Sequence, residues 1–123
     1  MAQPLEQLEA MRNVSDNWDG YGGAAPRPEL IDAAIAFFRG LRGVPGLSPP
    51  YVTPTRTGGV LFAWEQGPHQ LEVEVISTVR GEYLYLNRET GESASGTVQF
   101  QQDNGQPSFT LTAIMSALPA VTV

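Results

Sequence analysis

The chain has 123 residues and a hydrophobic fraction of 41%, which suits one domain with its own core and argues against wholesale disorder. It contains no cysteine, which excludes disulfides, thiolate metal sites and cysteine nucleophiles. The formal net charge is -6, and all the cations are arginines. We therefore expect an acidic surface that repels nucleic-acid phosphates and anionic membranes.

The same composition predicts a cytoplasmic protein. No apolar run approaches the ~20 residues that a transmembrane helix needs. The first residues carry acidic side chains and lack the apolar stretch of a secretion signal.

Residues 4–12 predict a short amphipathic helix, since Leu5, Leu8 and Met11 recur at helical spacing. The following stretch, 13–26, is rich in glycine and polar residues, which indicates a compact loop. Neither a calcium loop nor a dinucleotide loop fits its spacing, because the required ligand positions and the preceding strand are missing. We interpret Trp18 as a packing anchor and Asp19 as a turn residue that accepts backbone N–H bonds.

The clearest predicted helix runs from Pro28 to Arg42. Proline suits the first helical position, and Gly43 follows the last periodic residue. The helix carries a wide apolar stripe that needs a sheet or a helix to cover it: Leu30, Ile31, Ala34, Ile35, Phe38 and Leu41.

After a Gly/Pro-rich linker the periodicity becomes twofold, which is typical of strands. Four alternating runs are centred on residues 60–65, 71–76, 83–86 and 97–101, with Tyr51–Thr53 as a further edge strand before Pro54. Residues 109–118 favour a short helix, although 109–112 also fit a strand. The predicted fold is one α+β domain, residues 1–123. An antiparallel four- to five-stranded meander carries the Pro28–Arg42 helix on one face, with a short helix at each end of the chain.

Alternation also predicts a register: Trp64 opposite Leu71, Val75 opposite Leu84, and Leu86 opposite Val98. One face is then apolar and covered by the helix. The other face is mixed, and comprises Leu61, Ala63, Glu72, Glu74, Ile76, Tyr83, Tyr85, Gln99 and Gln101. Tyrosines on an open face are typical of protein interfaces. Two other interpretations stay open: the C-terminal segment covers this face, or the tyrosines are there because they suit strands.

For His69, and for the pair Glu72 and Glu74, we weigh a structural role against a catalytic or metal-binding one. His69, the single histidine, is interpreted as an exposed turn residue, since no second ligand accompanies it. Glu72 and Glu74 share a face, and such a pair can perform acid–base chemistry or hold a divalent ion. Solubilising an open sheet face is the favoured interpretation, and we expect no cofactor and no metal.

Several blocks, in order, resemble a family of small uncharacterised bacterial proteins. The marks are the Asn-Trp-Asp-Gly-Tyr-Gly block at 17–22 before the Pro-started helix, the Val-Thr-Pro-Thr run at 52–55, the Gly-Gly-led strand with Trp64, and Leu-Glu-Val-Glu-Val at 71–75. The resemblance spans Leu5 to Leu86. Arg27 stands where such proteins carry a capping serine, and Ala63 where a glutamate precedes the tryptophan. The resemblance implies no established activity; some relatives look like accessory proteins encoded beside toxin-like or mobile-element genes.

We therefore expect a non-enzymatic protein-interaction module, with an antitoxin or immunity-like role as one form, that binds an unknown protein partner or itself. The predicted partner-binding residues are Tyr83, Tyr85, Glu72, Glu74, Ile76 and Leu61. The alternative is a small carboxylate-based enzyme or ligand-binding domain that uses Asp19, Glu72 and Glu74.

Overall fold

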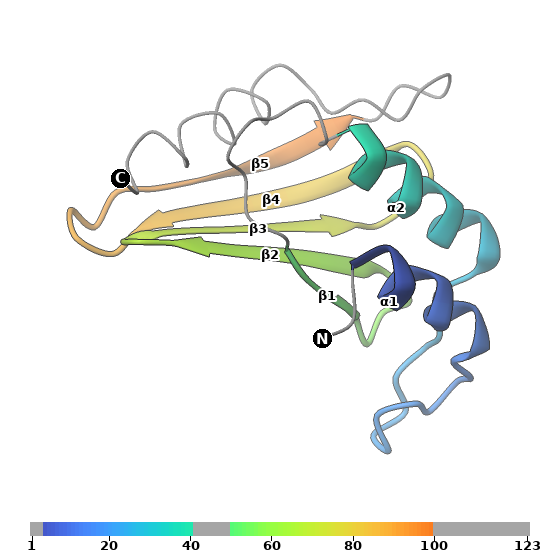
Figure 1. The fold of residues 1–123 in the computed structure, drawn as a ribbon. Helices are drawn as coiled ribbons and strands as arrows, with labels where there is room; N and C mark the ends of the chain where they lie inside the picture. Colours follow the sequence, from blue (N-terminus) through green and yellow to red (C-terminus); the bar gives the residue numbers. More distant parts are fainter. Residues whose placement is uncertain (1–3, 41–49, 100–123) are drawn as a thin grey trace.

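The computed structural model describes residues 4–40 and 50–99, which form an α+β fold (Figure 1). Five antiparallel strands make one sheet in the order β1-β2-β3-β4-β5, and the helices lie on one side of it. The predicted fold class is thus confirmed. The elements are α1 (Pro4–Ala10), a 3-10 turn η1 (Met11–Asn13), α2 (Pro28–Gly40), β1 (Tyr51–Pro54), β2 (Val60–Gln66), β3 (His69–Val75), β4 (Arg80–Asn87) and β5 (Ser93–Gln99).

Helix α2 begins at its proline, and the Arg27 carbonyl caps it by accepting the N–H groups of Leu30 and Ile31, both at 3.0 Å. The predicted end at Arg42 and the predicted C-terminal helix lie outside the described residues. Phe37, which the predicted apolar stripe omits, is fully buried.

The core lies between the helices and the sheet, and Phe62 of β2 is at its centre. The Phe62 ring meets Phe37 edge-on at 5.1 Å between centroids and stacks on Phe38 at 6.5 Å and Trp64 at 6.0 Å. Around these rings lie Leu8 of α1, Ile31 of α2 and further inward residues of β2 and β3: Val60, Leu71, Val73 and Val75. Burying a large apolar side chain contributes roughly 1.5–3 kcal/mol, so this layer dominates stability.

The predicted register of β2 and β3 is correct. Trp64 pairs with Leu71, Phe62 with Val73 and Val60 with Val75. The edge strand at Tyr51–Pro54 is also present, paired with β2.

The predicted register between β3 and β4 is wrong. Val75 pairs with Gly81 and Val73 with Tyr83, so β4 is displaced by an odd number of residues. Because side chains alternate between faces, an odd displacement turns the whole strand over. The physical reason is a tight turn: the Ile76 N–H donates to the Arg80 carbonyl at 3.0 Å, which brings Arg80 and Gly81 into the strand.

The predicted pairing of Val98 with Leu86 is wrong as well. Val98 pairs with Gly81, and Ser93 with Leu86. Because the turn at 87–92 is compact, β5 already begins at Ser93, before the run at 97–101 that the alternation of side chains predicts. In this turn the Asn87 side-chain oxygen accepts the N–H groups of Glu89 and Thr90, and Gly91 adopts a φ of +79°.

Candidate functional site

The side of the sheet away from the helices carries a cluster of glutamates. We call this side the open face. In the register of β2 to β5, Leu61, Glu74, Glu82 and Thr97 form one row across it. The next row contains Ala63, Glu72, Leu84 and Ser95. The sheet therefore brings together three carboxylates from two strands.

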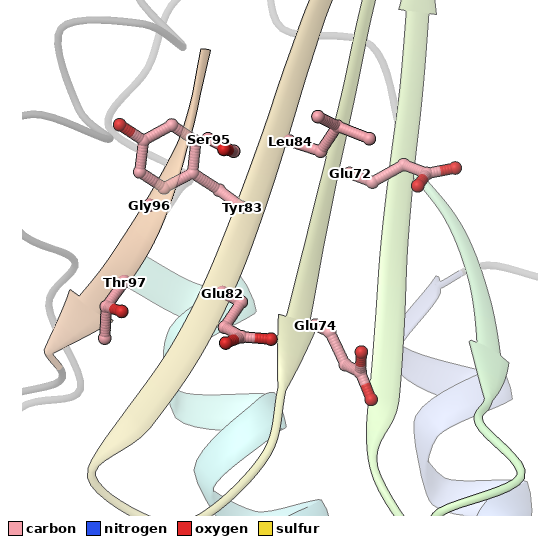
Figure 2. Close-up of a pocket in the computed structure, with 8 residues that line it drawn as sticks. All are labelled: Glu72, Glu74, Glu82, Tyr83, Leu84, Ser95, Gly96 and Thr97. Carbon is pink, nitrogen blue, oxygen red and sulfur yellow. The ribbon is translucent and has the colours of Figure 1, made fainter.

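A groove of about 390 Å³ lies along these rows. Its lining comprises Glu72 and Glu74 of β3, Glu82, Tyr83 and Leu84 of β4, and Ser95, Gly96 and Thr97 of β5. Figure 2 shows Glu72, Glu74, Glu82 and Leu84 projecting from the side of the sheet opposite the helices. Leu84 is 50% exposed, an unusual state for a leucine in the middle of a strand. The groove thus combines negative charge with one apolar side chain.

The charges in the groove are only partly balanced. Glu74 stands directly opposite Glu82, an arrangement that is destabilising for like charges. Arg80 pairs with Glu82 at 3.3 Å, whereas no ion pair with a described residue involves Glu72 or Glu74. Across residues 4–40 and 50–99, no three His, Asp or Glu side chains are grouped to hold a metal ion.

The predicted open-face tyrosines point the other way. Tyr83 and Tyr85 pair with the buried Val73 and Leu71 and pack against the core, so their predicted place on the open face is wrong. Tyr83 still borders the groove where its ring meets Gly96. Leu61 does lie on the open face, whereas Ile76 follows the end of β3 and is 38% exposed.

The ring of Tyr83 lies against Gly96 of β5. A Cβ atom at Gly96 would stand only 3.0 Å from the tyrosine ring, so the glycine makes room for it. Tyr83 therefore reaches across β5 on the helix side of the sheet.

Asp19 does not belong to the groove, because the loop uses its carboxylate internally. The Asp19 Oδ1 accepts the N–H groups of Tyr21 and Gly23, both at 2.9 Å, and Oδ2 pairs with Arg56 at 3.0 Å. The hydrogen bond from Tyr21, then that from Gly23 and the charge of Arg56, hold the pKa of Asp19 below its usual range. The predicted role of Asp19 as an acceptor of backbone N–H bonds is confirmed.

Trp18 joins the same loop to the chain that leads into α2. It is half-buried, and its indole N–H donates to the Ala24 carbonyl at 3.0 Å. Ala24 in turn bridges to Thr57 beyond β1. The 14–27 loop is thus a clasp between the helices and the β1–β2 hairpin.

His69 is buried, and its predicted exposure in a turn is wrong. It is the first residue of β3, 4% exposed, and its Nδ1 lies 2.6 Å from the Tyr85 hydroxyl. Three buried polar atoms in the described part of the chain lack a hydrogen-bond partner: Trp64 Nε1, Gln66 Oε1 and His69 Nε2. All three atoms belong to residues of strands β2 and β3.

Sequence reasoning missed Glu82, Leu84, Ser95 and Thr97 as groove residues. What would find them is the correct register of β4. Once Gly81 pairs with Val75, Glu82 lies opposite Glu74 and on the same face of the sheet. The alternation in β4 is ambiguous because Leu84 stands between two tyrosines. In the structure the partly buried Tyr83 and Tyr85 pack against the core, and Leu84 is on the other face.

Comparison with known proteins adds no constraint on this site. No family model, curated protein or solved structure matches the chain. Among the described residues, neither helix has the length and apolar character needed to cross a membrane.

Proposed function

We propose that this chain is a non-enzymatic protein-interaction module that binds a basic segment of a partner protein at the open face. The observation that carries the proposal is the glutamate groove. Glu72, Glu74 and Glu82 share one concave surface, and of the three only Glu82 forms an ion pair within residues 4–40 and 50–99. An arginine or lysine of a partner would supply the missing charge.

The electrostatic repulsion between Glu74 and Glu82 supports a binding role. A like-charged pair directly across two strands destabilises a sheet. The fold gains nothing from that pair, because Glu74 and Glu82 project away from the core. Residues kept at the expense of stability are typical of functional surfaces.

Leu84 supplies the apolar part of the surface. Interfaces join a desolvated apolar centre to a polar rim, and charges at the rim act chiefly on association rate and specificity. Half-exposed Leu84 lies in the same row as Glu72, with Ser95 on its other side. A partner segment with both basic and apolar side chains matches this surface.

The test is the triple substitution Glu72→Gln, Glu74→Gln, Glu82→Gln. The probe is an arginine-containing peptide, with binding measured by calorimetry and by NMR shift mapping at 50 and 300 mM salt. We expect the triple variant to lose binding and to be as stable as the native chain or more stable. A matched control neutralises three exposed glutamates outside the groove: Glu6, Glu29 and Glu89. Both variants change the net charge equally, so they separate a local site from general acidity.

Equal loss of binding in the control variant would show that overall charge, not the groove, attracts the probe. A triple variant that unfolds would show that the glutamates serve the fold. Either result would refute the proposal.

The enzyme alternative finds less support. It needs Asp19 together with Glu72 and Glu74, but Asp19 is held by its own loop and by Arg56 and does not line the groove. An antitoxin or immunity-like role remains one form of the proposed interaction, in which the basic partner is a toxin.

A further inference from the structure

Alternate backbone groups of β5 point outward from the described sheet. Asn87 N–H donates to the Glu92 carbonyl at 2.8 Å, and hydrogen-bonded pairs recur at every second position of an antiparallel ladder. Tyr85–Ala94 and Tyr83–Gly96 are therefore the bonded pairs between β4 and β5. It follows that Ser93, Ser95 and Thr97 direct their own N–H and C=O groups away from the sheet.

Nothing in the described residues pairs with these groups. No strand of the described sheet lies beyond β5, no backbone bond joins Ser95 or Thr97 to another loop, and residues 93–97 are exposed. Exposed edges of this kind are templates for a further strand.

Within β5 itself, the sequence has none of the features that discourage strand addition. Residues 93–99 contain no proline and no charged side chain, and their pairing with β4 runs without a bulge. The opposite edge differs, since β1 is short, ends in Pro54 and is contacted by α1. Among the described residues, β5 is thus the less protected edge and the one better suited to strand addition.

The groove lies next to this edge. Thr97 shares its row with Glu82, and Ser95 shares its row with Leu84. Strands lie about 4.8 Å apart, so a residue on an added strand opposite Thr97 would stand roughly 10 Å from the Glu82 backbone, within reach of a long basic side chain. Ser95 and Thr97 are small enough to let such side chains pass over them.

We propose that the partner binds as a sixth strand, antiparallel to β5, with a basic side chain directed to Glu82 and an apolar side chain to Leu84. The inference rests on the proposed function and specifies its partner as an extended segment with alternating side chains. On the helix side, the residue opposite Gly96 would meet the ring of Tyr83, which already lies over that glycine. Backbone bonds give such strand addition its affinity, and the alternate side chains give it specificity.

The test uses the full chain and the peptide acetyl-Thr-Arg-Thr-Leu-Thr-Arg-Thr-amide, whose arginines and leucine share one face when extended. We expect the largest amide shifts at Ser93, Ser95 and Thr97. Ser95→Pro removes an outward donor while leaving the bonds between β4 and β5, and should weaken binding by about tenfold. The matched control, Ser95→Ala, keeps the N–H group and should bind within about twofold of the native chain.

Two peptide variants keep the test decisive even where the proline variant is unstable. N-methylation of the peptide leucine removes a backbone donor and should weaken binding to the unaltered protein by about tenfold. A peptide with glutamates in place of its arginines should bind more weakly by a similar factor, most clearly at low salt.

Unchanged affinity on N-methylation, or shifts confined to Glu72 and Glu74, would overturn strand addition while leaving a basic partner on the open face intact. Equal binding of the acidic peptide would overturn the pairing with Glu82.

Discussion

The contact between Tyr85 and His69 offers the most direct test of how β4 sits in the sheet. Tyr85→Phe removes a hydroxyl that lies 2.6 Å from His69 Nδ1, and His69 is only 4% exposed. A buried polar atom left without a partner costs about 1–3 kcal/mol, so the free energy of unfolding should fall by that amount. Urea unfolding followed by tryptophan fluorescence measures the change. If the free energy of unfolding depends on urea concentration with the same slope (the m-value) in both proteins, only stability has changed.

The control is Tyr51→Phe, because Tyr51 is 65% exposed and no described residue accepts or donates a hydrogen bond to its hydroxyl. It should change stability by less than about 0.5 kcal/mol. If the two substitutions had equal effects, Tyr85 would not face the core, and the register of β3 with β4 given by the structure would be refuted in favour of the one that alternation alone predicts.

Phe62→Ala should cost about 3–5 kcal/mol, since its ring is fully buried among other aromatic rings; a melting temperature close to the native value would contradict the packing. Leu84→Ser should change stability by less than about 0.5 kcal/mol, and a loss of several kcal/mol in the same assay would place Leu84 in the core. Gly22→Ala should destabilise by about 1 kcal/mol, because Gly22 has a φ of +82° and open space around it; stabilisation on thermal melting would show that the strain is absent. The lowered pKa of Asp19 implies stability that is present above the ordinary carboxyl pKa of about 3.9 and lost as the pH falls through the lowered value. Asp19→Asn should therefore lower the melting temperature at pH 7, and its difference from the native chain should shrink below pH 4; a difference that is constant with pH would exclude this linkage.

The sequence predicts the fold class because its periodicities are strong and local. The α2 stripe and the alternation in β2 and β3 both reflect one buried face, and the short Gln66–His69 turn leaves one register for that hairpin. The Asp19 turn is likewise predictable, since the two backbone N–H groups that Asp19 accepts lie within four residues along the chain.

The groove is less predictable because β4 has apolar side chains on both faces. Tyr83 and Leu84 are both plausible core residues, and only the geometry of the Ile76–Arg80 turn decides between them. His69 illustrates the same limit: its burial depends on Tyr85 from another strand, which no local pattern contains.

The consecutive order of the strands has a consequence for folding kinetics. Every strand pairs with its neighbour along the chain, so the sheet can grow hairpin by hairpin with small loop-closure entropy. The clasp from Ala24 to Thr57 joins more distant parts of the chain and gains its contacts only after β1 and β2 have met. We therefore expect the β2–β3–β4 hairpins to form the folding nucleus and the 14–27 loop to close late. Substitutions in the loop should then accelerate unfolding and leave the folding rate nearly unchanged.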